Sequence, residues 1–208
     1  MSAFAIRQPL SAVSSKKVAD KLLRATAALH KHLCPRQVLG VRMGVYAGRL
    51  LGIDLPQQDK RLIAFVETDG CFTDGVMVAT GCSLGHRTMR LIDYGKVAVT
   101  VADTKVERAV RIWPSAGSRQ LAAQCAPDAP NRWQAQLDGY QRISDEKLLA
   151  HAWVDLELSL SAIVGKKGVR VNCDICGEEV LNGREHASAG RLICSHCGGQ
   201  SYYRPVAK

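Results

Sequence analysis

CDICG at residues 173–177 and CSHCGG at residues 194–199 are two cysteine pairs of the form C-x2-C, separated by a spacer of 17 residues. Each pair predicts a tight knuckle turn that presents two thiolates to one metal, and two knuckles complete a tetrahedral four-thiolate site. The glycine after each pair allows the backbone to turn beneath the sulfur atoms. The pattern predicts a zinc ribbon with a structural zinc held by Cys173, Cys176, Cys194 and Cys197. Four thiolates also suit iron, which is the alternative metal.

The composition is that of a globular protein rather than a disordered or fibrous one. The chain has 208 residues, 47% hydrophobic and 23% charged, and this length is enough for one or two domains. No apolar run reaches the roughly 20 residues that span a bilayer, and residues 1–10 lack the pattern of a secretory signal. We therefore expect a cytoplasmic protein with no membrane partner. Its eight cysteines then favour metal or thiol chemistry over disulfides.

The residues before the ribbon predict a larger domain of the α+β class, with helices packed on a mixed β-sheet. Helical periodicity and turn residues predict helices at 18–29, 35–51, 73–80, 134–140 and 145–158. Short apolar and alternating runs predict strands at 62–66, 97–101 and 106–113. Gly165-Lys-Lys-Gly168 is the natural linker, so we expect domains at 1–164 and 165–208.

Gly40, Gly44 and Gly48 recur at every fourth position of the helix expected at 35–51. Each glycine costs a helix about 1 kcal/mol relative to alanine, so another backbone must approach this face closely. We expect tight helix packing there. A second copy of the chain is one candidate for the packing partner, which would make the protein a homodimer.

A second group of metal-binding residue types falls at the predicted ends of elements. Cys34 precedes Pro35 and is expected at the N-cap of a helix, where free backbone N–H groups stabilise a thiolate. A short helix bracketed by Cys71 and Cys82 is expected to bring both thiols to one point. The predicted second metal site consists of His32, Cys34, Cys71 and Cys82, with His30, Asp74 and His86 as outer candidates.

Three blocks of the main domain resemble the FmdE family, named after the E component of formylmethanofuran dehydrogenase, in order and spacing. They are HKHLCPRQVLGVRMG at 30–44, ETDGCFTDGVMVATGCSLGHRT at 67–88 and LIDYGKVAVTV at 91–101. CDICGEEV and RLICSHCG are similar to the DksA/TraR-type zinc finger that many two-domain members carry. The resemblance implies an α+β domain, often dimeric, with a metal site, and a link to a molybdenum or tungsten enzyme that oxidises or makes formyl groups.

The resemblance also assigns site residues. The family's motif positions correspond here to His32, Cys34, Cys71, Asp74, Cys82, Tyr94, Gly95 and Lys96. Arg36 stands where the family usually has glycine after the Cys-Pro pair. A cation at this position would lower the pKa of the thiol or bind an anion, or it would fill the site and exclude the usual ligand.

These observations predict a metal-binding protein with a structural zinc and a second transition metal. A mixed nitrogen and sulfur site suits zinc, iron, nickel or copper. Metal handling and an accessory role to a molybdenum or tungsten oxidoreductase fit equally well, and an open position would accept a small molecule or a transferable metal. Catalysis is left open, with Asp74 as a base and Lys96 or Arg36 holding an oxyanion.

The alternative function is a nucleic-acid-binding or transcription-associated module. Residues 1–60 carry 10 basic and 3 acidic residues, and residues 165–208 carry 7 and 4, so the positive charge lies at the two ends. Tyr202, Tyr203 and Arg204 would then be contact residues. A third hypothesis makes Cys34, Cys71 and Cys82 inert core thiols in an interaction scaffold.

Overall fold

The structure is a computed structural model that describes residues 12–165, 168–204 and 206. The chain divides into two compact units, residues 1–157 and residues 158–208. In this division the helix α7 (Leu160–Gly165) belongs to the second unit. In the described part of the chain, no helix is long and apolar enough to cross a membrane.

The first unit contains a mixed five-stranded sheet, which confirms the α+β class. Its strands are β1 (Leu62–Val66), β2 (Met89–Leu91), β3 (Val99–Asp103), β4 (Arg108–Pro114) and β5 (Leu149–Val154), in the spatial order β2-β1-β3-β4-β5. β1 pairs with β2 in parallel, and the other neighbours are antiparallel. Every residue of β1 and β3 is buried, as expected for apolar strands at the centre of a sheet.

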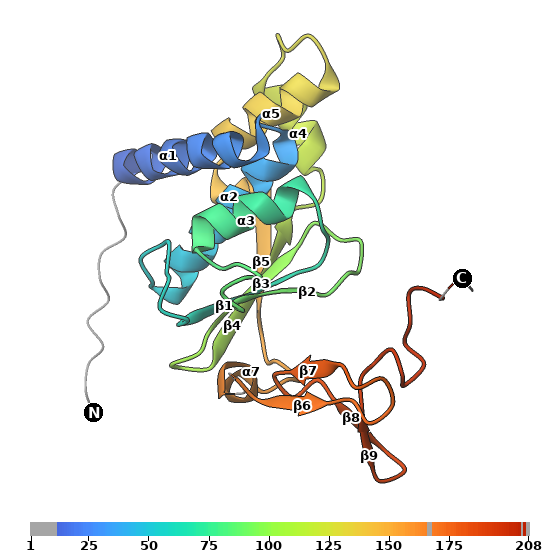
Figure 1. The fold of residues 1–208 in the computed structure, drawn as a ribbon. Coiled ribbons are helices and arrows are strands. Elements are labelled where there is room, and N and C mark those ends of the chain that lie inside the picture. Colours follow the sequence, from blue (N-terminus) through green and yellow to red (C-terminus); the bar gives the residue numbers. More distant parts are fainter. Residues whose placement is uncertain (1–11, 166–167, 205, 207–208) are drawn as a thin grey trace, which may run out of the picture. The chain divides into compact units, whose positions relative to one another are not determined.

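Six helices within the described residues accompany this sheet, and Figure 1 shows them gathered on one side of it. They are α1 (Ala12–His30), α2 (Pro35–Leu51), α3 (Cys71–Thr80), α4 (Ser118–Cys125), α5 (Arg132–Arg142) and α6 (Asp145–Leu148). α2 contacts β3 and β4, and α3 contacts β1. The predicted start and end of α2 are confirmed, with Pro35 at its first position and Gly52 in the left-handed conformation at its C-cap.

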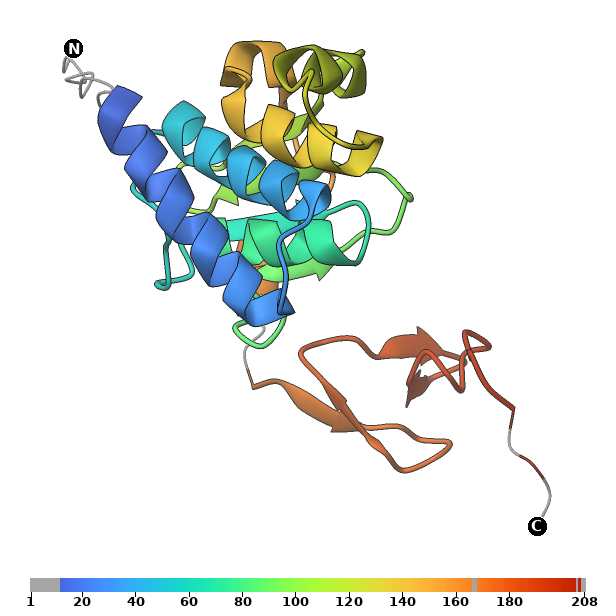
Figure 2. The same ribbon diagram turned by 90° about the horizontal axis from the view of Figure 1, so that it is seen from above.

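The expected close approach at the glycine face of α2 is confirmed, and α3 of the same chain makes it. A Cβ atom on Gly40 would lie 2.9 Å from the amide nitrogen of Val76, and one on Gly44 would clash with Ala79. α2 and α3 therefore run parallel with their backbones nearly in contact, as Figure 2 also shows. A second copy of the chain is not the packing partner of this face, so the homodimer stays a prediction from the family resemblance alone.

One expectation about the helices is wrong. The sequence predicts one helix over residues 145–158, but α6 ends at Leu148 and β5 follows directly. This segment pairs with β4 over its whole length, and the hydrogen bonds of the sheet override its helical propensity. In α1 the buried face includes Leu22 and Thr26, whereas Leu29 is exposed.

The second unit contains α7 and two small hairpins. β6 (Arg170–Asn172) pairs with β7 (Glu179–Leu181), and β8 (His186–Ser188) pairs with β9 (Arg191–Ile193), both antiparallel. Gly177, which follows the first cysteine pair, has a φ of 77°, so the predicted turn beneath the sulfur atoms needs a glycine there.

Candidate functional site

The candidate site in the main domain lies where α1 ends and α2 and α3 begin. Lys31 has a φ of 65°, which turns the chain sharply after the last residue of α1. Cys34 is the N-cap of α2, and its backbone N–H donates a 2.7 Å hydrogen bond to Oε1 of Gln37. The buried Gln37 amide in turn donates to the carbonyl oxygen of Thr26 in α1. These bonds fix the N-terminus of α2 against the end of α1.

Five of the predicted residues lie at this junction. Sγ of Cys71 lies 3.2 Å from Nε2 of His30, and Nδ1 of His30 lies 2.7 Å from Oδ2 of Asp74. We call these three side chains the Cys71–His30–Asp74 array. The Cys34 thiol lies close enough to Cys71 to affect its pKa, and the rings of His30 and His32 are 4.7 Å apart between centroids.

The electrostatics of the array follow from its place at two helix ends. Because α2 and α3 are parallel, both of their positive N-terminal ends lie at Cys34 and Cys71, which favours negative charge there. Burial and the hydrogen bond with the Cys34 thiol nevertheless raise the pKa of Cys71. When Nδ1–H of His30 donates to Asp74, the lone pair on Nε2 faces the Cys71 thiol. The array therefore presents an imidazole nitrogen beside the Cys71 thiol.

The structure does not bring Cys82 to this cluster, so its expected convergence with Cys71 is wrong. Cys71 begins α3 and Cys82 follows its C-cap, and a helix of 10 residues is about 15 Å long. The Cys82 thiol is 1% exposed and donates to the carbonyl oxygen of Leu62. Burial raises its pKa, as expected for a core thiol.

Three further candidates are exposed side chains. His86 lies in the loop after α3, with Nδ1 3.1 Å from the Ser83 hydroxyl. Lys96 lies over the ring of Tyr94, and Arg36 is exposed in the first turn of α2. His86 and Lys96 thus interact with residues outside the array.

The ribbon cysteines converge as predicted. The ligand atoms of Cys173, Cys176, Cys194 and Cys197 all lie within 4.8 Å of one another. The Sγ atoms of Cys176 and Cys194 are 3.9 Å apart, and tetrahedral zinc with bonds of about 2.3 Å requires about 3.8 Å. The donor set and its spacing therefore fit a structural zinc. Among the residues described, this is the only group of three or more such side chains with mutual distances this short.

The ribbon thiols differ strongly in acidity. Hydrogen bonds from the amides of Cys176 and Cys194 lower the pKa of Cys173 to about 6. Burial and the neighbouring thiols raise the pKa of Cys197 to about 12. The backbone stabilises the Cys173 thiolate, whereas burial and the neighbouring thiols disfavour a negative charge on Cys197. A divalent cation compensates the negative charges and therefore favours deprotonation of the cysteines that bind it.

Two side chains are more central to the main-domain site than the sequence pattern indicates. That pattern puts His30 and Asp74 at the edge of the site, but they form two of the three members of the array. The sequence spacing does indicate that Asp74 lies beside Cys71, because Asp74 comes one turn after Cys71 on α3 and helical residues three apart share a face. The position of His30 depends on the left-handed Lys31, which no sequence pattern indicated.

Known proteins similar to this chain share its main domain. The family described as "FmdE, Molybdenum formylmethanofuran dehydrogenase operon" matches residues 29–150. A "Probable S-adenosyl-L-methionine-binding protein" of Archaeoglobus fulgidus is 30% identical over 92% of this chain, and the chain spans 56% of that longer protein. The crystal structure of a tungsten formylmethanofuran dehydrogenase FmdE-like protein from Syntrophus aciditrophicus has a TM-score of 0.59. It is 20% identical and covers 89% of this chain and 95% of its own, which shows a shared fold.

Proposed function

The chain belongs to the FmdE family, and from this premise we propose that it is a metal-binding protein with two centres. One is a structural zinc on the four ribbon cysteines. The other is a transition-metal site in the main domain formed by Cys34, Cys71 and His30. Metal handling, or an accessory role to a molybdenum or tungsten oxidoreductase, is the cellular function that we propose. The association of the family with a molybdenum formylmethanofuran dehydrogenase operon supports the second of these roles.

The observation that carries this proposal is the His30–Asp74 hydrogen bond beside Cys71. A metal-binding histidine usually donates its second ring N–H to a carboxylate, which fixes the tautomer and leaves the other nitrogen free for the metal. His30 has this arrangement at 2.7 Å, and its free Nε2 lies 3.2 Å from a thiol. Two thiols and an imidazole are donors that suit zinc, nickel, iron or copper.

The donors form a chain of contacts rather than a closed set, so metal binding has to draw them together. Cys71 lies 3.2 Å from His30 and close enough to Cys34 for that thiol to raise its pKa, so Cys71 is the central donor of the proposed site. The exposed His32 lies beside His30 and supplies a further imidazole. A metal bound by three side chains keeps an open position, where it supplies Lewis-acid chemistry or holds an exchangeable ligand.

Metal content tests this proposal. The protein is purified without chelator or affinity nickel, and metals per chain are measured in the wild type and in C34S, C71S and C125S. We expect about two metals in the wild type and about one in C34S and C71S. Cys125, half-buried at the end of α4, is the matched control and should leave both metals bound. One metal in all four proteins would overturn the second site and leave the ribbon zinc.

Nucleic-acid binding by the ribbon is the second candidate, and one observation favours it. The ring of Tyr203 is stacked on His196 at 4.8 Å and contacts Tyr202, whose side chain is 96% exposed. Exposed stacked rings beside Arg204 are typical of surfaces that bind unpaired bases. Binding of a single-stranded oligonucleotide should weaken steeply with salt and be lost in Y202A. Binding that is absent, or equal in Y202A, would reject this candidate.

A further inference from the structure

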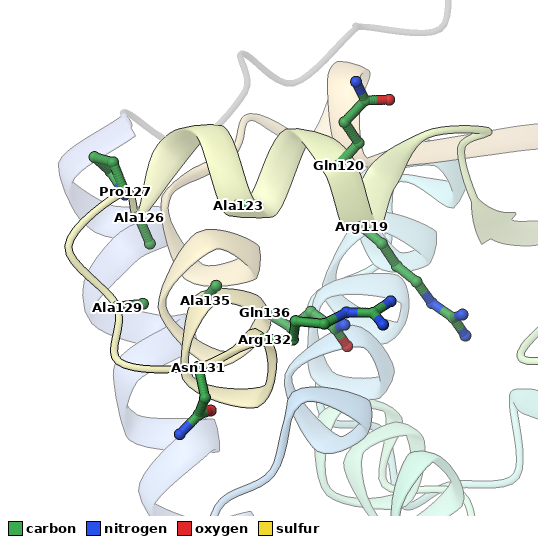
Figure 3. A pocket seen from close by; sticks show the side chains of 10 residues that line it. All are labelled: Arg119, Gln120, Ala123, Ala126, Pro127, Ala129, Asn131, Arg132, Ala135 and Gln136. Carbon is green, nitrogen blue, oxygen red and sulfur yellow. The ribbon is translucent and has the colours of Figure 1, made fainter.

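We propose that the hairpin of α4 and α5 binds a small organic oxyanion, a carboxylate or phosphate attached to a short apolar body. The two helices enclose an open cavity of about 580 Å³, which shares no residue with the metal site. Figure 3 shows its lining: Arg119, Gln120, Ala123, Ala126, Pro127, Ala129, Asn131, Arg132, Ala135 and Gln136.

The cavity lies beside a close contact of the two helices and is lined by small side chains. A Cβ atom on Gly139 of α5 would be only 2.6 Å from Cα of Ala122 in α4, so the backbones are in contact there. Four alanines and one proline then line the space between the helices and the loop that joins them. These side chains are too short to fill it, which leaves an apolar surface of limited size.

The polar part of the lining is positively charged. Arg119 comes from α4 and Arg132 from α5, and Figure 3 shows both guanidinium groups on the same side of the cavity, with Gln136 beside Arg132. No Asp or Glu belongs to the lining, and Asp128, in the connecting loop, is exposed outside it. Within the described residues, neither arginine forms an ion pair, and Arg119 lies near the Tyr140 hydroxyl.

Two guanidinium groups beside a small apolar surface favour an anionic ligand with a short apolar body. A guanidinium presents several N–H donors in a plane that matches carboxylate and phosphate oxygens. Gln120 and Gln136 add amide donors, whereas the Asn131 side chain already caps α5 by accepting from the Gln134 amide. A cation would meet two like charges here, and a neutral apolar molecule would leave both guanidinium groups unused. The alanine floor accommodates the body of the ligand.

Titration with phenyl phosphate, followed by amide chemical shifts, tests this proposal, with benzyl alcohol and benzylamine as the neutral and cationic probes. We expect saturable shifts in residues 119–136 with phenyl phosphate only, weakening as salt is added. R132Q should weaken binding by about tenfold or more, because a charge-assisted hydrogen bond is lost. R132Q is the main variant because Arg132 lies at the first position of α5, exposed, where its side chain does not hold the hairpin together.

R24Q is the matched control, because Arg24 is an exposed arginine of α1 that does not line the cavity, so its loss changes the net charge without changing α4 or α5. It should bind phenyl phosphate as the wild type does. Equal binding by R132Q and the wild type, shifts confined to other parts of the chain, or equal shifts with all three probes would overturn the proposal. Each outcome is independent of metal content, so failure here leaves the metal proposal standing.

Discussion

Replacing Gly40 with alanine tests whether the contact between α2 and α3 builds the main domain. The added Cβ would lie 2.9 Å from the Val76 amide nitrogen and closer still to the carbonyl oxygen of Phe72. Both neighbours are backbone atoms, and the closer one requires the helices to separate by about 1 Å to restore ordinary contact distance. Overpacking of this kind costs up to about 3 kcal/mol, and the higher helix propensity of alanine returns about 1 kcal/mol. The expected net loss is about 2 kcal/mol.

Urea unfolding measured by tryptophan fluorescence is the assay, because Trp113, Trp133 and Trp153 all lie in the first unit. With a slope of about 2 kcal/mol per molar urea, the loss lowers the midpoint by about 1 M. G48A is the graded control: its Cβ would first meet the side chain of Leu55, which can turn away, and only one backbone atom, the carbonyl oxygen of Ile53 at 2.9 Å, so a loss smaller than that of G40A is expected. A G40A protein as stable as the wild type, or more stable, would refute the packing argument.

Three other predictions concern the ion pairs and the metal sites. Burial acts to raise the pKa of Asp103, but hydrogen bonds from Arg61 and from the Lys105 amide outweigh it and hold that pKa below its ordinary value. The stability that this carboxylate contributes is therefore complete above its unfolded-state pKa of about 3.9 and is lost as the pH falls below that value. The free energy of unfolding, measured from pH 6 to pH 3, should fall less steeply in D103N than in the wild type. D74N should weaken metal binding at the second site by about 10- to 100-fold in a competition titration, and unchanged affinity would show that the carboxylate does not orient His30. A chelator should abolish the dispersed amide signals of residues 169–204 without changing the tryptophan fluorescence, and loss of the fluorescence signal as well would contradict independent folding of the two units.

The elements that the sequence predicts correctly are those determined by residues close together in the chain. The bounds of α2 follow from Pro35 and Gly52, and the ribbon follows from four cysteines at fixed spacing. β5 was missed because the pairing that stabilises it comes from β4, which lies far away in the chain. Short apolar segments do not carry enough periodicity to distinguish a strand from a helix, and the sheet decides between them.

The candidate site was predicted in part for the same physical reason. Cys34 and Cys71 stand at helix N-termini that sequence signals place well, and the structure brings them together because α2 and α3 are parallel. Cys82 is near Cys71 along the chain but not in space, because a ten-residue helix separates them. The cavity between α4 and α5 left no sequence motif, since its arginines come from two helices and become neighbours only in the folded hairpin.

X-ray absorption at the edge of the metal found in the purified protein tests the second site most directly. Ribbon zinc alone gives a shell of four sulfur atoms at about 2.3 Å. If Cys34, Cys71 and His30 hold a metal, the wild type shows an additional nitrogen component at about 2.0–2.1 Å, and C71S loses it. A four-sulfur shell in the wild type, unchanged in C71S and with one metal per chain, would contradict a metal centre in the main domain.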